Sequence, residues 1–333
     1  MTRAVSRERV GAAGLGVALA FATASAASAE ESGFVPPQGN VWMSAAFERW
    51  SADERYAGPF GADAGFRGLD PDNPGSPIES GDVVPIKLDV PESRSSSEAV
   101  VVKLRVAPLE RVLTGVTLPA YQRSVFEQTG TRVTTAGTGD VFLVAGYQLT
   151  PRDLAVGSAL YAEAKLPTTQ LEVEDLSVPL SEGQVDLGVE QATTWAVLPA
   201  LHVTGRLLLR HRFEADAQVG GTRARIKPGD EMEAGVEVGG EPVRRVWLKT
   251  GYRGLWATAS EDRTLARHIR PIEKRQIHWW QAGAYLGFGG WLGQALDGLA
   301  LDLAFRYPLG GVDYLRGIAW SAGLAYGFDW NAS

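Results

Sequence analysis

The segment 320–330, WSAGLAYGFDW, alternates strictly between two kinds of side chain. Every even position from Trp320 to Trp330 is large or apolar, and every odd position from Ser321 to Asp329 is small or polar. Side chains of a β-strand point alternately to its two faces. The segment therefore predicts a strand with one apolar face and one face of small, polar residues.

This strand resembles the C-terminal signal strand of bacterial outer-membrane barrels. The resemblance rests on polar Ser321, then Gly323, then the aromatic residues Tyr326 and Phe328, close to the end of the sequence. It implies that the barrel assembly machinery of the outer membrane recognises the strand, and that the strand ends on the periplasmic side.

The N-terminus has the pattern of a secretory signal peptide. Three arginines lie within the first nine residues, an apolar run follows over 10–22, and Ala-Ser-Ala at 27–29 has the form of a cleavage site. We expect a cleaved signal peptide over 1–29 and a single domain over 30–333. The alternative, an N-terminal membrane anchor, is disfavoured because the apolar run is short of the ~20 residues that a spanning helix needs.

Composition excludes several classes of function. The chain has no cysteine, which excludes thiol redox chemistry and thiolate metal sites. Its formal net charge is -7, and removal of residues 1–29, which carry +2, takes the mature chain to -9. An acidic chain argues against nucleic-acid binding, for which a basic face is expected.

Alternation recurs along the chain and predicts an all-β fold of about twelve strands. Strands of about ten to fifteen residues exceed the usual mode of five or six, which favours an antiparallel up-and-down transmembrane β-barrel. The expected strands are 40–50, 98–107, 111–121, 139–149, 154–166, 183–195, 199–213, 229–239, 243–257, 276–288, 297–308 and 317–330.

Short and long connections alternate between these strands, as they do in outer-membrane barrels with periplasmic turns and extracellular loops. An even number of strands puts both termini on the periplasmic side and the longest loop, 51–97, outside the cell. Within that loop 83–90 is expected to form a short strand that extends 98–107. Short turns are expected at 108–110, 150–153, 197–199 and 240–242, and longer connections at 122–138, 167–182, 214–228, 258–275 and 309–316. Only the connection 289–296 is long for a periplasmic turn.

Alternation alone does not say which face is wet. Neighbouring strands carry complementary charges, with acidic 229–239 between basic 199–213 and 243–257, and this favours a charged lumen. The alternative is the solvated face of a soluble sheet, where each ion pair contributes ~0–1 kcal/mol. The expected lumen-lining residues are Glu163, Lys165, Asp186, Glu190, Arg206, Arg210, Glu231, Glu233, Glu237, Lys249, Arg253, Asp302 and Arg306.

Three sequence elements resemble the outer-membrane transporters named for the MetA pathway of phenol degradation. They are GTGDVFL at 137–143, AKLPT at 164–168 and VDLG at 185–188, and the resemblance covers roughly 137–330. The family's glycine after K-L-P-T is replaced by Thr169. The resemblance implies an outer-membrane barrel that passes small solutes, including aromatic or apolar compounds.

No catalytic or metal-binding pattern emerges. The four histidines form no HExxH or HxH motif, and only His211 is expected on a lipid-facing strand position. We therefore expect no enzyme, no catalytic residue, no metal and no cofactor. A barrel enzyme with an outward-facing histidine stays open as the least favoured alternative.

The sequence favours a channel in the bacterial outer membrane whose partners are membrane lipid, the assembly machinery and a small solute. Selectivity would come from charge in the lumen. A clear path, if present, is expected along 317–330, because the inward side chains of that strand are the smallest. The alternative is a barrel closed by side-chain pairing that has a structural or surface-binding role through 51–97.

Overall fold

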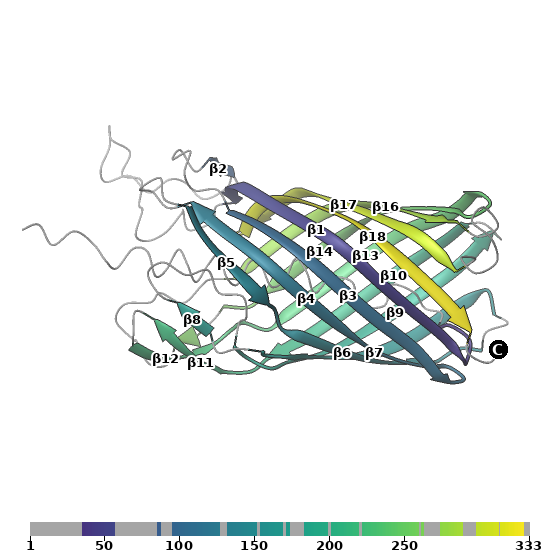
Figure 1. Cartoon of the computed structure of the whole chain (residues 1–333), viewed down its shortest axis with the longest axis horizontal. Helices are drawn as coiled ribbons and strands as arrows, with labels where there is room; N and C mark the ends of the chain where they lie inside the picture. Colours follow the sequence, from purple (N-terminus) through teal and green to yellow (C-terminus); the bar gives the residue numbers. More distant parts are fainter. Residues whose placement is uncertain are drawn as a thin grey trace, which may run out of the picture.

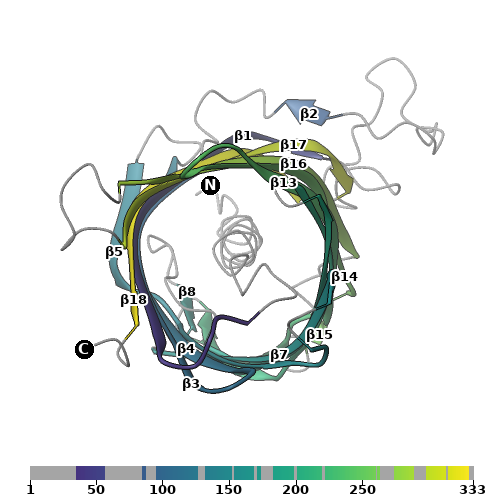
Figure 2. The same cartoon turned by 90° about the vertical axis from the view of Figure 1, so that its right-hand side faces the viewer.

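The structure is a computed structural model in which twelve strands form a closed antiparallel β-barrel (Figures 1 and 2). The fold predicted from the sequence is confirmed. Among the described residues, no helix is long and apolar enough to cross a membrane. The structure describes residues 35–56, 85–87, 95–126, 132–151, 154–168, 171–173, 183–198, 201–219, 222–259, 261–262, 274–288, 298–312 and 314–329.

Each barrel strand pairs with its neighbours in sequence, and β18 closes the ring against β1 from Asn40↔Asp329 to Tyr56↔Tyr314. No strand of the ring is left with a free edge along its whole length, which satisfies the backbone as a membrane span requires. The strands are β1 (Asn40–Tyr56), β3 (Ser95–Leu109), β4 (Val112–Phe126), β6 (Val141–Gln148), β7 (Val156–Leu166), β9 (Asp186–Leu198), β10 (Leu201–Arg212), β13 (Glu231–Val243), β14 (Val246–Ala257), β16 (Arg275–Gly287), β17 (Leu299–Val312) and β18 (Tyr314–Asp329).

The two ends of the barrel differ. We call the end where β1 begins and β18 ends the termini end, and the opposite end the loop end (Figure 1). At the termini end β3 turns into β4 through Glu110 and Arg111, and β13 into β14 through Arg244 and Arg245. Arg111 and Arg245 have positive φ values of 66° and 71°, as expected in tight hairpin turns.

These two turns lie later than predicted. Pro108 and Pro242 were expected in the turns at 108–110 and 240–242, but both belong to strands. Each sits where the strand register shifts, between Val106 and Leu109 and between Gly240 and Val243. Proline lacks the N–H that a regular ladder needs, so it is tolerated at such an irregularity.

Additional short strands lie at the loop end, within segments that were predicted as connections. One is β5 (Arg132–Thr138), which pairs with β4. The others form a separate four-stranded sheet beside the barrel mouth (Figure 1). They are β8 (Leu171–Val173), β11 (Ala215–Val219), β12 (Thr222–Lys227) and β15 (Glu261–Asp262).

Two further connections are corrected. The predicted connection 309–316 is almost all strand, because β17 ends at Val312 and β18 begins at Tyr314. The short strand predicted in 83–90 exists as β2 (Pro85–Lys87), but it pairs with β1 rather than extending β3. Residues 57–84 and 88–94 of the predicted loop 51–97 lie outside the described residues.

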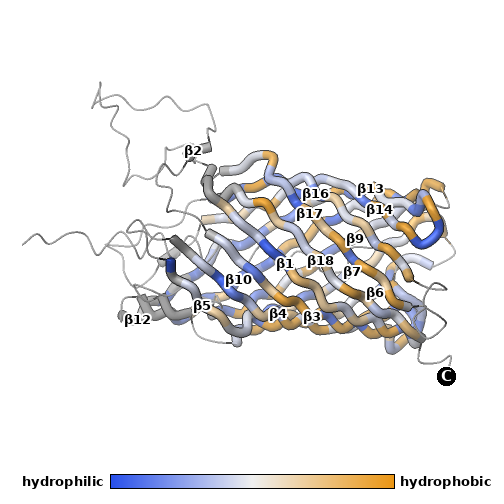
Figure 3. The backbone as a smooth tube through the Cα atoms, turned by 45° about the horizontal axis from the view of Figure 1, so that its top comes forward, coloured by the Kyte–Doolittle hydropathy of each residue, from blue (hydrophilic) through white to orange (hydrophobic). Residues whose placement is uncertain are grey.

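The two faces of the wall differ in chemistry. On β10 the outward Leu207 and Leu209 are 41% and 53% exposed, whereas the inward Leu208 and Arg210 are 3% and 7% exposed. Hydrophobic residues follow the strands all along the wall with hydrophilic ones between them (Figure 3). The barrel is therefore apolar outside and polar inside, the reverse of a soluble sandwich.

Candidate functional site in the barrel interior

The structure places the expected lining residues on the inward face of six strands. Strands β7, β9, β10, β13 and β14 are consecutive in the ring, and β17 lies on the far side of β16. Strand β18 faces β9 across the ring, because six strand positions separate them. The charged strands β7, β9 and β10 thus lie opposite the strand with the smallest inward side chains.

Arginine and glutamate form a compact network near the loop end of this wall. Arg210 contacts Glu163 through Nη2 and Glu231 through Nη1, both at 2.9 Å. Glu231 also accepts a hydrogen bond from Arg212 Nη1 at 3.0 Å and lies 3.9 Å from Arg275 Nη2. All five side chains are buried, so each charge is held by an opposite charge rather than by water.

A lysine joins the network to the three elements that resemble the transporter family. Lys165 Nζ lies 2.8 Å from Asp186 Oδ2 and 3.6 Å from Asp140 Oδ2. Thr168 links the same elements, because its Oγ1 donates a hydrogen bond to the carbonyl oxygen of Gly139 at 3.1 Å. The elements at 137–143, 164–168 and 185–188 therefore meet at one place, where β6, β7 and β9 reach the loop end.

Further ion pairs continue the network toward the termini end. Arg206 binds Glu190 through Nε and Nη2 at 2.8 and 2.9 Å. Arg253 donates to Glu233. Lys249 lies 3.6 Å from Glu237, which also accepts a hydrogen bond from Gln281 at 3.2 Å. We call the whole set from Asp140 to Glu237 the charge ladder; its members are Asp140, Glu163, Lys165, Asp186, Glu190, Arg206, Arg210, Arg212, Glu231, Glu233, Glu237, Lys249, Arg253 and Arg275.

The charge ladder neutralises itself. Its cations and anions lie on neighbouring strands within salt-bridge distance, and Glu190 is 0% exposed. Charges paired in this way are fixed in position and cannot be separated without leaving a buried partner uncompensated. The ladder is thus a rigid, filled part of the wall.

The opposite wall is built from small residues. Inward positions on β18 are Ala319, Ser321 and Gly323, and all three are partly exposed. Asp302 and Arg306 are the inward charges of β17 and are also partly exposed. Side-chain volume in the interior is therefore unequal, with bulk on β7 to β14 and the smallest inward side chains on β18.

Of the residues in the C-terminal signal pattern, Ser321 and Gly323 face inward, whereas Tyr326 and Phe328 face outward with ring centroids 5.9 Å apart. The outward pair lies at the termini end of β18. Trp330 lies outside the described residues.

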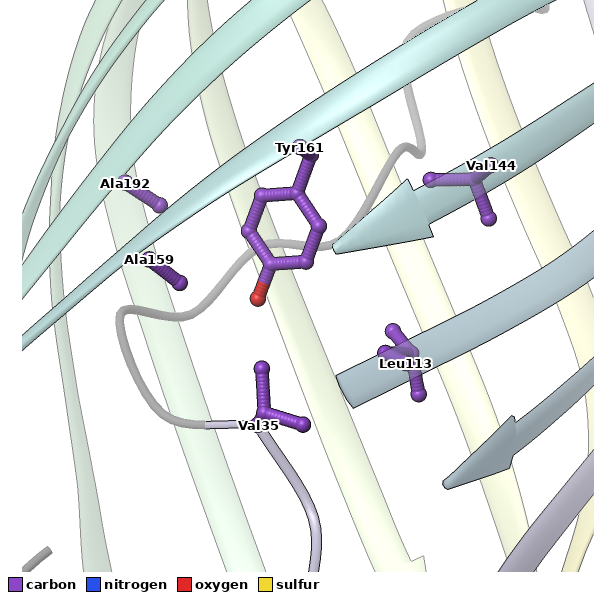
Figure 4. Close-up of a cluster of buried hydrophobic side chains, with 6 residues drawn as sticks. All are labelled: Val35, Leu113, Val144, Ala159, Tyr161 and Ala192. Carbon is purple, nitrogen blue, oxygen red and sulfur yellow. The ribbon is translucent and has the colours of Figure 1, made fainter. Parts of the chain in front are cut away.

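The chain that precedes β1 enters the interior at the termini end. Val35 is 3% exposed, and its backbone N–H donates to Gln148 Oε1 at 3.0 Å. It packs in a cluster with side chains from β4, β6, β7 and β9 (Figure 4). That cluster comprises Val35, Leu113, Val144, Ala159, Tyr161 and Ala192. The segment that contains Val35 therefore occupies part of the barrel mouth.

Replacing Val35 by aspartate is expected to release this segment. An ionised carboxylate without a partner in an apolar cluster costs several kcal/mol, and the segment can leave the interior without breaking a strand pair. We expect higher single-channel conductance with unchanged barrel stability in planar bilayers. The control is Gln38→Asp, because Gln38 is exposed in the same segment. Equal conductance in the two variants would show that Val35 does not obstruct the mouth.

Histidines on the outer face correct one prediction. His211 faces outward as expected, with its Nδ1 3.0 Å from Asp230 Oδ1. The expectation that it alone does so is wrong, because His278 hydrogen-bonds the outward Tyr252 and packs edge-on against Trp256. The inward neighbours of His278, Ile277 and Trp279, are apolar, so the usual polarity is inverted locally around His278. In the part of the chain that the structure describes, no three metal-ligating side chains come together.

Several interior residues were missed by the sequence analysis. Arg275 lies one position before the predicted strand 276–288, and Asp140, near the start of the predicted strand 139–149, was not among the expected lumen-lining residues. Glu48 and Lys103 lie on the inward faces of β1 and β3. The alternation of side chains within 40–50 and 98–107 could have identified both, since each shares its face with small or buried residues.

Comparison with known proteins gives likeness at the level of structure. No protein-family model matches the sequence, and no curated protein matches it. The chain is similar to the COG4313 outer membrane channel from Pseudomonas putida F1, with a TM-score of 0.67 and 13% identity over 88% of this chain and 97% of that one. It also matches the translocator domain of the autotransporter NalP from Neisseria meningitidis, with a TM-score of 0.45 and 11% identity over 88% and 90% of the two chains. The first likeness shows that the fold is one that outer-membrane channels use.

Proposed function

We propose that this protein is a channel of the bacterial outer membrane through which small solutes diffuse, and that it is not an enzyme. The observation that carries the proposal is the reversed polarity of a closed barrel, with apolar side chains exposed outside and charged side chains inside. An outer face of this kind is more stable in contact with lipid than in contact with water.

Aromatic side chains on the outer face support a membrane location. Trp280 packs against Phe305 with ring centroids 6.1 Å apart, and Phe47 against Trp320 at 5.5 Å. Barrels of the outer membrane carry such aromatic residues at the boundaries of their apolar band. We propose that a signal peptide over 1–29 directs export and that β18 is the strand read by the assembly machinery.

The lengths of the connections support one orientation. Two-residue turns join β3 to β4 and β13 to β14 at the termini end, whereas the additional strands lie at the loop end. We propose that the termini end faces the periplasm and that 51–97 lies outside the cell. Solutes would then enter beside the small four-stranded sheet.

The solute class that we propose is small compounds, including aromatic or apolar ones. The resemblance to the phenol-degradation transporters supports it, and so do the aromatic side chains that face inward beside the small wall. Trp50 lies over Gly317, so that a Cβ at this glycine would overlap the indole ring. Trp42 of β1 and Tyr285 of β16 also face inward, on either side of β17 and β18.

A second function is favoured by the charge ladder itself. Self-neutralised charges and the Val35 cluster fill part of the interior, as in a barrel that is closed by its own side chains. Such a barrel would have a structural or surface-binding role. It differs from a channel in having no conductance, however well it inserts into the bilayer.

Conductance and solute flux test the proposal. We expect the refolded protein to give discrete conductance steps in planar bilayers and to permit swelling of liposomes in small solutes such as phenol or benzoate. Protein that is folded and inserted, as shown by heat-dependent gel mobility, but gives neither current nor swelling would contradict a channel and favour the closed barrel. Release of fatty acid from phospholipid by the same preparation would instead revive an enzyme.

A further inference from the structure

Three adjacent strands form a floor of small side chains inside the barrel. Ser321 of β18 pairs with Ala304 of β17 on one side and with Glu48 of β1 on the other. One level toward the termini end, Gly323 pairs with Asp302 and with Ala46. Strands lie about 4.8 Å apart, so β1 and β17 are separated by about 10 Å with only small residues between them.

Four ionisable side chains border this floor. Asp302 and Arg306 flank Ala304 on the inward face of β17, and Glu48 lies across β18 from them. Lys103 projects from the next strand, β3, where it pairs with Ser44. Inward-facing Glu48 therefore has Lys103 on the strand to one side and Asp302 and Arg306 on the second strand to the other side. We call Glu48, Lys103, Asp302 and Arg306 the β1–β17 charge group.

This group differs from the charge ladder in its surroundings. Ladder residues such as Glu190 and Arg212 are fully buried in tight ion pairs. All four members of the β1–β17 charge group are partly exposed, and so are Ser321 and Gly323 between them. A solute that crosses the barrel can reach partly exposed charges of this kind, whereas it cannot reach ladder side chains that are fully buried, such as Glu190 and Arg212.

We propose that the β1–β17 charge group is the selectivity site of the channel and that solutes pass over the small floor of β18. The inference rests on the proposed function. Two acids and two bases give the site no net charge and a transverse field, which suits small neutral or dipolar solutes and passes both signs of ion weakly. Removing one acid leaves a net positive site, and removing one base leaves a net negative one.

Ion selectivity tests the proposal through reversal potentials in a KCl gradient across a planar bilayer. A unit charge about 6 Å from an ion in water-like surroundings changes its occupancy about threefold. We expect Glu48→Gln and Asp302→Asn each to raise the chloride-to-potassium permeability ratio about tenfold, because chloride occupancy rises and potassium occupancy falls by that factor of about three each. Arg306→Gln should lower the ratio by a similar factor.

The matched control removes one ladder pair, Glu190→Gln with Arg206→Gln, which leaves the net charge unchanged and should leave the permeability ratio unchanged. Two results from a conducting channel would overturn the inference. One is a permeability ratio that changes as much in the control as in Glu48→Gln, and the other is a ratio that none of the three single variants changes. If one acid variant fails to fold, the other acid variant and Arg306→Gln decide, because their expected signs are opposite. If Arg306→Gln fails to fold, the two acid variants decide against the ladder control. Absence of current in the unaltered protein would contradict the proposed function instead.

Discussion

Replacing Arg210 by methionine is expected to lower the free energy of unfolding by about 3–5 kcal/mol. Arg210 is buried and lies between Glu163 and Glu231, with 2.9 Å to each. Methionine keeps much of the side-chain volume but leaves two buried carboxylates without this cation. Arg210→Lys keeps the charge, so it should lower the free energy of unfolding by less. Some loss should remain, because a lysine ammonium cannot contact both carboxylates in the planar geometry of a guanidinium.

Urea unfolding of the barrel in detergent or lipid measures this effect. The matched control is Arg225→Met, because Arg225 is 63% exposed and lies 3.3 Å from Glu214 at the surface. A surface pair of that kind contributes ~0–1 kcal/mol. Adding Glu163→Gln to Arg210→Met should recover part of the loss, since it neutralises one of the two carboxylates that Arg210 contacts, whereas Glu231 keeps Arg212 and Arg275 as partners. If Arg210→Met were as mild as the surface control, the ladder would not be a fixed part of the wall.

The barrel could be predicted from the sequence because its signal is local. In β10, odd positions such as Leu207 and Leu209 face outward and even positions such as Arg206 and Arg210 face inward. This assignment stays the same when the predicted ends of the strand are wrong by a few residues. The acidic strand β13 between β10 and β14 was predictable for the same reason, since neighbours in sequence are neighbours in an up-and-down barrel.

The missed elements depend on contacts between distant segments. Strands β8 and β11 are parallel and pair Leu171 with Ala217, and three to six residues are too few to show a period. Asp140 became part of the ladder only because Lys165 and Asp186 reach the same level of the barrel. No feature of 35–39 indicates that Val35 returns to the interior, because its partners on β4 to β9 follow much later in the chain.

Replacing Leu207 by arginine is the most direct test of the outward apolar face. Leu207 is 41% exposed and belongs to the middle of β10, so its side chain would lie in the hydrocarbon of a membrane. Arginine on the lipid face costs about 2–4 kcal/mol near the bilayer midplane and about 0–1 kcal/mol near the interface. We therefore expect a loss of about 2–4 kcal/mol in unfolding free energy and a lower yield of inserted barrel.

The control for depth is Val243→Arg, because Val243 is 65% exposed but lies beside the turn between β13 and β14. At the interface the arginine head can reach water, so this variant should lose no more than about 1 kcal/mol. In a soluble sheet both arginines would face water and both substitutions would be mild. A large difference between Leu207→Arg and Val243→Arg in lipid vesicles is thus a property that only a membrane-spanning wall has. Equal, small effects would contradict the membrane location on which the channel depends.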